Sequence, residues 1–457
     1  MQRIVRFIPF WSVIALLVYM PFHIFLSQWL STATGGLEAW KLGKDIILAA
    51  LVLFSICLVY QQRCTSREFN ILVGVAAGYG LLHAALWLLH PALFRDSALL
   101  GIIYNNRLLA FLLLGASAGL LLGRDELKAQ LPLLRTVIIT ASTVVAVVGI
   151  VQYFLPKDIL THFGYSLDRG VRPNFFIDDN PAFPRIMSTL RDPNSLAAYL
   201  LLPLALLSVQ LSHIRDFARS RQVLLAGLFA IHIAALYLTF ARSAWLGAAV
   251  MFAAIIWWQF SSQFVHILRK WWPAGVILVL LTGTVLFTQR HNAAIDGVLT
   301  HSTSAQVGQY DSNEYHWLYV KRGLEGIWHN PLGHGPGTAG LASIQNPHGG
   351  LLTENYYVQI GYEVGVVGLA VFVGAQVWLY MRLLRGRDDW KVVLLASFWA
   401  YAVINMLLHM WSNEAVAAQW WLAAGVLLTV SSAGAGKPKT AKKPGGRSRA
   451  TTKHANA

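Results

Sequence analysis

A polar segment that meets an apolar run holds the residues best suited to chemistry. Within PHGGLLTENYYVQIGYEVGVVG (Pro347–Gly368), five polar side chains lie within about three helical turns of one another: His348, Glu354, Asn355, Gln359 and Glu363. Ionisable groups are expensive to bury at a bilayer surface, so several together predict a working site. Glu354 and His348 are the candidate proton acceptors, because a carboxylate or imidazole near an apolar surface can have its pKa tuned toward neutrality.

The same residues also admit structural interpretations. Glu354 could be an acidic residue at the start of a helix, with Thr353 as the cap. Asn355, Gln359 and Glu363 recur every fourth residue and share one helical face, so they are candidate supporting residues of a polar crevice. They could instead hydrogen-bond to neighbouring helices. A loop histidine such as His348 is as often solvated as catalytic.

Arginines on connections outside the membrane form the second group. They are Arg169, Arg172, Arg185, Arg191 and Arg242. A guanidinium forks two donors onto phosphate oxygens and never loses its charge, so this group predicts a phosphate site. Arg242 lies in a turn of a few residues between two apolar runs, which places its side chain at the depth of a lipid-linked phosphate. Arg172 and Arg185 could equally be solvated loop residues.

Ion pairing is the main alternative for two of these arginines. Arg242 could pair with Asp192 or Glu354, or could snorkel to lipid headgroups. Arg191 could pair with the neighbouring Asp192 at the start of a span. Both alternatives stay open at the level of the sequence.

Other polar patterns indicate less. Asn330–Gly340, NPLGHGPGTAG, is rich in glycine but lacks the Lys-Ser/Thr ending of a P-loop. It predicts a tight turn, although its amides could form an anion nest. His329, His334 and His348 do not have the spacing of a zinc site and no cysteine joins them, so no metal site is predicted.

Membrane-spanning helices must position these residues. The chain has 457 residues, of which 56% are hydrophobic and only 12% charged, which predicts an all-α integral membrane protein. Apolar windows long enough to cross roughly 30 Å of hydrocarbon recur about twelve times. The predicted spans are 8–30, 45–61, 70–93, 103–122, 132–154, 194–212, 222–240, 243–260, 272–289, 356–381, 391–410 and 414–432.

Lys and Arg residues fall on alternate short connections, which places those connections and both termini in the cytoplasm. A large extracytoplasmic loop then separates spans 9 and 10. The predicted organisation is spans 1–5 (1–154), an extracytoplasmic loop (155–193), spans 6–9 (194–289), the large loop (290–351), spans 10–12 (352–432) and a disordered basic cytoplasmic tail (433–457). Within the large loop, Trp317–Trp328 predicts an amphipathic helix on the outer membrane face. Because much of the net charge of +15 lies in the tail, no nucleic-acid partner is predicted.

Three segments resemble the O-antigen ligase and polymerase superfamily of bacterial membrane glycosyltransferases. Arg185–Leu207, RIMSTLRDPNSLAAYLLLPLALL, resembles the family's Arg-x-x-Gly/Ser…Asn-x-x-Ala segment. Leu236–Val250, LYLTFARSAWLGAAV, is similar to its Thr-x-Ser-Arg-Ser/Gly-x-x-Leu turn. The third joins Gly323–Gly340 to Glu354–Gly368 and is similar to its Asn-Pro-Leu-Gly-x-Gly and acidic-x-Gly-x-x-Gly ending. Together these segments cover most of residues 185–370.

The resemblance implies a reaction and a place. The donor would be a glycan on undecaprenyl pyrophosphate, and the acceptor a hydroxyl of a glycan, lipid or protein, without metal or cofactor. Arg191 and Arg242, assisted by Arg172 and Arg185, would hold the pyrophosphate and stabilise its charge as it leaves. The acceptor would attack with inversion, helped by a base. The reaction would take place at the outer face of the cytoplasmic membrane, among its lipids.

The chain departs from the ligase pattern at the base. Ligases carry His-Asn/Ser/Gln, nine residues, then Gly, whereas this chain has Glu354 before Asn355, nine residues, then Gly365. A family Arg ahead of the surface helix appears here as His316. The base is therefore Glu354, or else His348 or His316 supplies it. Ligase, polymerase and protein-glycosylating activities all stay open.

A transporter of lipid-linked sugars is the rival from another class. A transporter should carry ionisable residues at mid-membrane and show repeat symmetry. The predicted span centres are nearly free of charge and no internal repeat stands out. The sequence therefore favours the enzyme.

Overall fold

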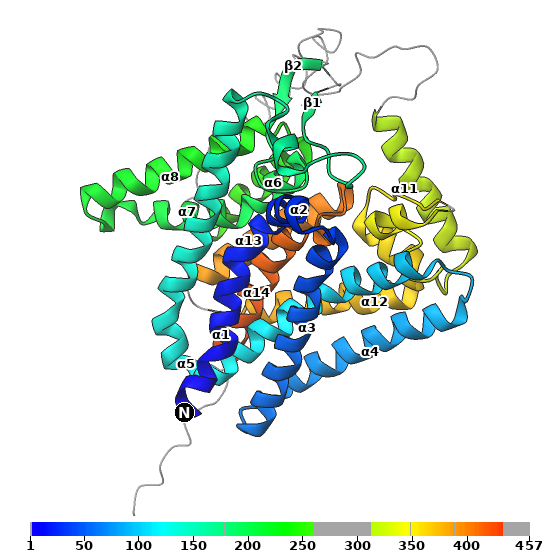
Figure 1. Ribbon diagram of the computed structural model, residues 1–457. Coiled ribbons are helices and arrows are strands. Elements are labelled where there is room, and N and C mark those ends of the chain that lie inside the picture. Colours follow the sequence, from blue (N-terminus) through cyan, green and yellow to red (C-terminus); the bar gives the residue numbers. More distant parts are fainter. Residues whose placement is uncertain (1, 178–179, 260–311, 348, 387–388, 433–457) are drawn as a thin grey trace, which may run out of the picture.

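The computed structural model describes residues 2–177, 180–259, 312–347, 349–386 and 389–432 (Figure 1). His348, the predicted span 272–289 and the tail 433–457 lie outside these described residues. The described chain is almost wholly helical, as predicted.

Most of the helices are long and apolar. In the N-terminal half they are α1 (Gln2–Tyr19), η1 (Met20–Phe22), α2 (His23–Thr34), α3 (Leu37–Gln61), α4 (Arg67–Leu89) and α5 (Arg95–Phe154). They continue with α6 (Pro193–Tyr199), α7 (Leu201–Ser212), η3 (Ile214–Asp216), α8 (Arg219–Leu238) and helical residues 242–259. The last are α11 (Ser312–His329), η5 (Gly340–Gln345), α12 (Tyr356–Leu383), α13 (Asp389–Leu407), η6 (Met410–Ser412) and α14 (Glu414–Ser432). Eight helical segments in the described part could cross a membrane by length and composition, so the protein is a multi-pass membrane protein.

Two of the long helices are broken at a glycine. An unbroken α5 of 60 residues would be about 90 Å long, roughly three times the hydrocarbon thickness of a bilayer. Gly123 adopts φ 72° and ψ 173°, which glycine reaches without steric cost, and divides α5 into helices 95–122 and 124–154. These halves contain the predicted spans 103–122 and 132–154. Gly365, with φ 69°, breaks α12 in the same way.

The core lies where α14 packs against α5. A Cβ on Gly115 would collide with the Leu422 carbonyl, and one on Gly425 with the Leu112 carbonyl, so the two backbones touch through small residues. The described part of α14 is buried almost throughout. Figure 1 shows α14 within the bundle, and it also contacts α1 and α12.

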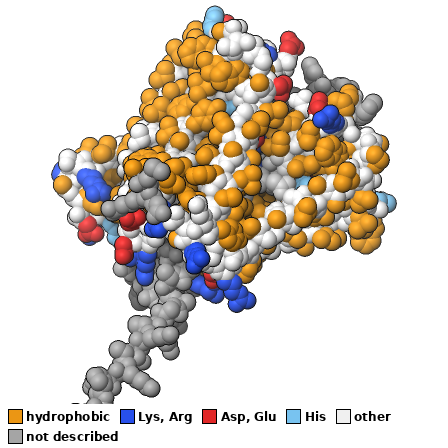
Figure 2. Space-filling model, turned by 60° about the horizontal axis from the view of Figure 1, so that its bottom comes forward, with side chains coloured by type: hydrophobic (Ala, Val, Ile, Leu, Met, Phe, Trp, Pro, Cys, Tyr) orange, Lys and Arg blue, Asp and Glu red, His pale blue; other side chains and the backbone are white. Residues whose placement is uncertain are grey.

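The surface matches a lipid environment. Figure 2 shows a face covered largely by apolar side chains, with charged side chains gathered toward its margins. Large apolar residues such as Leu53 on α3 and Leu81 and Leu88 on α4 are more than half exposed. Apolar area on this scale is far more than a soluble protein presents to water.

Residues 155–193 form a compact cap at the end of the molecule opposite the N-terminus (Figure 1). After η2 (Ile159–Phe163), strands β1 (Phe175–Ile177) and β2 (Asn180–Arg185) pair antiparallel, with Phe175 opposite Arg185. The sequence analysis predicted a loop here and no strand. The hairpin directs the chain from the cap back toward α6.

Candidate functional site

Arg185 joins the two turns that carry the other candidate arginines. Its Nε donates to the Thr239 carbonyl at 2.8 Å, and its Nη2 donates to Asn194 Oδ1 at 3.0 Å. Thr239 ends α8 just before Arg242, and Asn194 lies on the first turn of α6 just after Arg191. The three arginine-bearing segments predicted from the sequence therefore meet. Arg185 therefore links these two turns by hydrogen bonds and is not a solvated loop residue.

Arg242 is half-buried close to Arg185. Burial lowers the pKa of Arg185, the carboxylate of Asp192 opposes that effect, and the charge of Arg242 adds to it. Two guanidinium groups thus repel each other in a partly dehydrated place. An anion bound beside them would relieve the repulsion. The turn before Arg242 also contains Phe240 with φ 50°, a strained conformation for a bulky residue.

Arg191 is half-buried and makes no hydrogen bond or ion pair with any residue of the described chain. The pair with Asp192 that the sequence left open does not form. Asp192 instead caps α6, with Oδ1 accepting from the Ser195 amide and Oδ2 from the Ser195 hydroxyl, both at 2.8 Å. The Arg191 guanidinium therefore keeps all its donors for another partner.

Glu354 and His316 are brought together across the start of α12. Glu354 Oε2 lies 3.8 Å from His316 Nδ1, and both side chains are 31% exposed. Burial raises the pKa of Glu354 and lowers that of His316. Glu354 also has φ 51°, a left-handed conformation that is uncommon outside glycine and typical of functional sites. The carboxylate of Glu354 is thus held where it accepts a proton more readily than an ordinary glutamate does.

The cap of α12 is Asn355 rather than Thr353 or Glu354. Asn355 Oδ1 accepts from the Val358 amide at 3.0 Å, while its Nδ2 donates to the Met406 carbonyl at 2.8 Å. This second bond attaches the start of α12 to the end of α13. Asn355 is therefore a structural residue next to Glu354.

Glu363 and Gln359 hold the glycine-rich segment. Glu363 is fully buried; its Oε1 accepts from the amides of Gly337 (2.9 Å) and Ala339 (3.2 Å), and its Oε2 accepts from Asn105 Nδ2 (2.6 Å). The segment does form an anion nest, and the anion is this carboxylate of the same chain. Gln359 is buried beside it. Of the two sequence interpretations, hydrogen bonding to neighbouring elements describes these residues.

Arg172 and Arg169 lie outside this constellation. Arg172 is exposed, with its guanidinium 5.8 Å from the Phe175 ring. Arg169 Nε donates to Gln28 Oε1 at 3.0 Å and ties the cap to α2. Among the described residues, no group of three or more His, Cys, Asp or Glu side chains could hold a metal ion.

Two residues near this group were not singled out from the sequence, Tyr104 on α5 and His409 after α13. The segment after His409, η6, packs against α5 and against α6, which follows Arg191, and the charge of Arg191 acts on both residues. Burial, with the charge of Arg191, lowers the pKa of His409 to about 4, so its imidazole is neutral at physiological pH. The only local signal is a polar residue inside or between apolar runs, as in GIIYNNR and LLHMWS.

Comparison with known proteins adds one family. Residues 226–373 match a family model described as O-antigen ligase. No curated protein matches the chain. The matched range contains Arg242, His316 and Glu354 but stops short of Arg185 and Arg191. The resemblance to the superfamily is thereby confirmed.

Proposed function

We propose that the chain is a membrane glycosyltransferase of the O-antigen ligase superfamily, which the match of residues 226–373 to that family model supports. The donor is a glycan carried on undecaprenyl pyrophosphate, and the acceptor is a hydroxyl group of a glycan, lipid or protein. The reaction takes place at the outer face of the cytoplasmic membrane. It requires no metal ion.

The unpaired guanidinium of Arg191 carries this proposal. Arg191 is half-buried and its donors engage no described residue, so they are available to the oxygens of an anion. Arg191 lies in a constellation that Arg185 connects to the turn of Arg242. A diphosphate offers enough oxygens to engage two guanidinium groups, and its lipid tail suits the apolar surface around them.

Two sets of residues carry out the transfer: one activates the acceptor and the other stabilises the leaving group. Glu354 accepts the proton of the acceptor hydroxyl, whose oxygen attacks the anomeric carbon from the face opposite the diphosphate. The bond from that carbon to the diphosphate oxygen breaks, and undecaprenyl pyrophosphate leaves. Arg191 and Arg242 stabilise the charge that grows on the leaving oxygen, an effect worth about 10²–10³ in rate per donor in other enzymes.

His316 and His348 remain the alternatives to Glu354 as base. His316 lies 3.8 Å from Glu354 and is suited to orient the carboxylate. His348 falls outside the described residues. Substituting each of the three separately distinguishes them, since only loss of the base should remove the dependence of the rate on its ionisation.

The test is transfer by the purified protein in liposomes. A fluorescent undecaprenyl-pyrophosphate oligosaccharide is supplied with and without candidate acceptors, and release of the lipid pyrophosphate is followed. We expect release that depends on the acceptor and disappears in Arg242→Ala and Glu354→Ala. Arg219→Ala, an exposed arginine at the start of α8, is the matched control and should behave as wild type.

The products then define the activity. A ladder of lengthening chains means a polymerase, and a single addition means a ligase or a protein glycosyltransferase according to the acceptor used. No release with any acceptor, together with passage of the sugar across the liposome membrane, would replace the proposal with a transporter.

A further inference from the structure

Tyr104 presents an unused hydroxyl to the arginine constellation. The residue is half-buried on α5, and its hydroxyl makes no hydrogen bond with a described residue. The guanidinium of Arg107, one turn further along the helix, lies 4.7 Å from the centre of its ring. This stacking contact orients the phenol, while the charge of Arg191 acts on it from the other segment.

His409 presents an unused nitrogen to the same place. Its Nδ1 is buried without a hydrogen-bond partner. The backbone around it is fixed, because the Leu408 carbonyl accepts from the Tyr356 amide at 3.2 Å and the His409 carbonyl accepts from the Ser412 amide at 3.1 Å. The charged and titratable groups that act on the ring are Arg191, Asp192 and His316.

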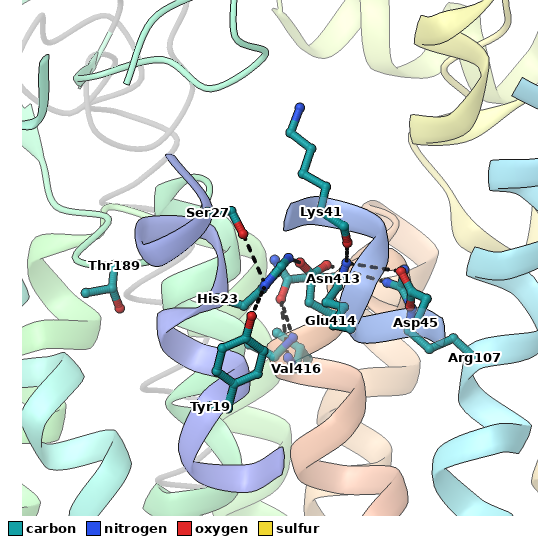
Figure 3. Close-up of polar contacts among 12 residues, drawn as sticks. Tyr19, His23, Ser27, Lys41, Asp45, Arg107, Thr189, Asn413, Glu414 and Val416 are labelled. Carbon is teal, nitrogen blue, oxygen red and sulfur yellow. Dashed lines mark hydrogen bonds and ion pairs between the residues drawn. The ribbon is translucent and has the colours of Figure 1, made fainter. Parts of the chain in front are cut away.

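One buried ion network supports both residues (Figure 3). Arg107 binds Asp45 through two bonds of 2.9 and 3.1 Å, and its Nη1 lies 3.5 Å from Glu414 Oε2. Glu414 begins α14 directly after η6, so it fixes the far end of the segment that starts at His409. The network thus holds Tyr104 through Arg107 and the His409 segment through Glu414.

The network itself leaves no charge for a ligand. Lys44 and Arg107 are balanced by Asp45 and Glu414, and His23 adds a contact of 3.7 Å to Glu414. Its side chains are nearly all buried. The side chains without a hydrogen-bond partner in the described chain, Arg191, Tyr104 and His409 through its Nδ1, are not part of this network.

The segments that carry the three groups pack together, because η6, which follows His409, contacts both α5 and α6. The buried Nδ1 of His409 has no hydrogen bond, which costs about 1–3 kcal/mol, and the donors of Arg191 and Tyr104 engage no described residue. Together these groups suit a ligand with several acceptor atoms. One cation beside two neutral donors suits the spread oxygens of a diphosphate better than a single carboxylate. We propose that Tyr104 and His409 are further binding residues, which donate hydrogen bonds to the diphosphate alongside Arg191. This inference rests on the proposed function and names residues outside the matched segment.

The experiment measures binding of glycan-free undecaprenyl pyrophosphate to the purified full chain, together with donor turnover. Tyr104→Phe removes only one oxygen atom, so it should leave folding unchanged and weaken binding about tenfold, as expected for a hydrogen bond to a charged group. His409→Ala should do the same, whereas His409→Asn, which keeps a donor near the position of Nδ1, should recover part of the affinity. The KM for the donor should rise more than kcat falls.

Matched controls lie elsewhere on the helices. Tyr60→Phe removes a hydroxyl that bonds Asn70 on the surface, and His213→Ala removes a histidine that is nearly half exposed. Neither should change binding. If wild type binds and turns over the donor while Tyr104→Phe and His409→Ala match it, the inference is overturned and the proposed function stands. If wild type neither binds nor turns over the donor, the proposed function itself fails.

Discussion

Two arginines of the described chain, Arg107 and Arg191, differ in whether other side chains pair with them. Arg107 lies in the buried ion network, where Asp45 and Glu414 satisfy it. Arg191 is half-buried and has no hydrogen-bond or ion-pair partner in the described chain. The residue type is the same in both cases. The pairing of a guanidinium, rather than its presence near a membrane, therefore separates a structural arginine from one that is available to a ligand.

The buried ion network around Arg107 helps to position the helices that carry the group around Arg191. The network draws its side chains from α2, α3, α5 and α14, which are distant in sequence. Buried ion pairs contribute little net stability, because dehydration offsets their attraction, but they penalise arrangements in which a charge is left alone. The network therefore favours one way of packing these four helices against one another.

The largest expected effect is a loss of stability when the buried ion network around Arg107 is broken. Arg107→Met leaves the two buried carboxylates of Asp45 and Glu414 with one lysine, Lys44, to balance them, which should destabilise the protein by about 3–5 kcal/mol. The melting temperature in detergent should fall accordingly. The double variant Arg107→Met with Asp45→Asn should recover part of the loss. A fall no larger than that of the exposed control Arg219→Ala would show that the network does not hold the helices.

Removing Arg191 should reduce transfer activity but not stability. Arg191→Ala breaks no hydrogen bond or ion pair with a described residue, so the melting temperature should change little. Transfer should fall by about 10²–10³ because a donor to the leaving diphosphate is lost. Arg191→Lys keeps the charge but loses the fork of donors, and should recover only part of the rate. Normal transfer by Arg191→Ala would remove the main support for the diphosphate site.

The helices could be predicted because an apolar run is a local property. The windows 391–410 and 414–432 correspond to α13 and α14, and the break at Gly123 separates two predicted spans. The arginines could be singled out as candidates because their chemistry and their position on polar connections between apolar runs can both be seen in the sequence. The β1–β2 hairpin was missed, since it is short and its strands carry no alternating pattern.

The structural roles of several polar residues could not be predicted, because they depend on contacts between residues that are distant in sequence. Asn355 and Glu363 were grouped on one helical face, but α12 starts at Tyr356, so Asn355 caps the helix while Glu363 binds amides of Gly337 and Ala339. Arg107 was not singled out because it lies near the start of the predicted span 103–122, but it is buried in the middle of helix 95–122. Only the fold brings Asp45 and Glu414 to that residue and makes its burial possible.

A smaller effect should appear in the pH dependence of transfer. Burial raises the pKa of Glu354, so its carboxyl stays protonated, and unable to accept a proton, up to a higher pH than an ordinary glutamate. The rate should therefore fall on the acid side at a pH above the usual range for carboxyl groups, and recover as the pH rises. Profiles of kcat for wild type, Glu354→Asp and His316→Ala test this. An unchanged acid limb in Glu354→Asp would assign the base to another group, with His348 the next to substitute.

The smallest effect should come from an exposed ion pair on the helix that also supplies Asp45. Lys41 Nζ lies 3.0 Å from Glu38 Oε1, a distance like those in the buried network, but the two side chains are 28% and 69% exposed. Water and salt screen such a pair, so Glu38→Gln should change stability by less than about 1 kcal/mol and leave transfer unaltered. Melting temperatures at low and high salt would measure the residual attraction. A loss comparable to that of Arg107→Met would mean that burial does not distinguish the two pairs, and the contrast between Arg107 and Arg191 would then need another cause.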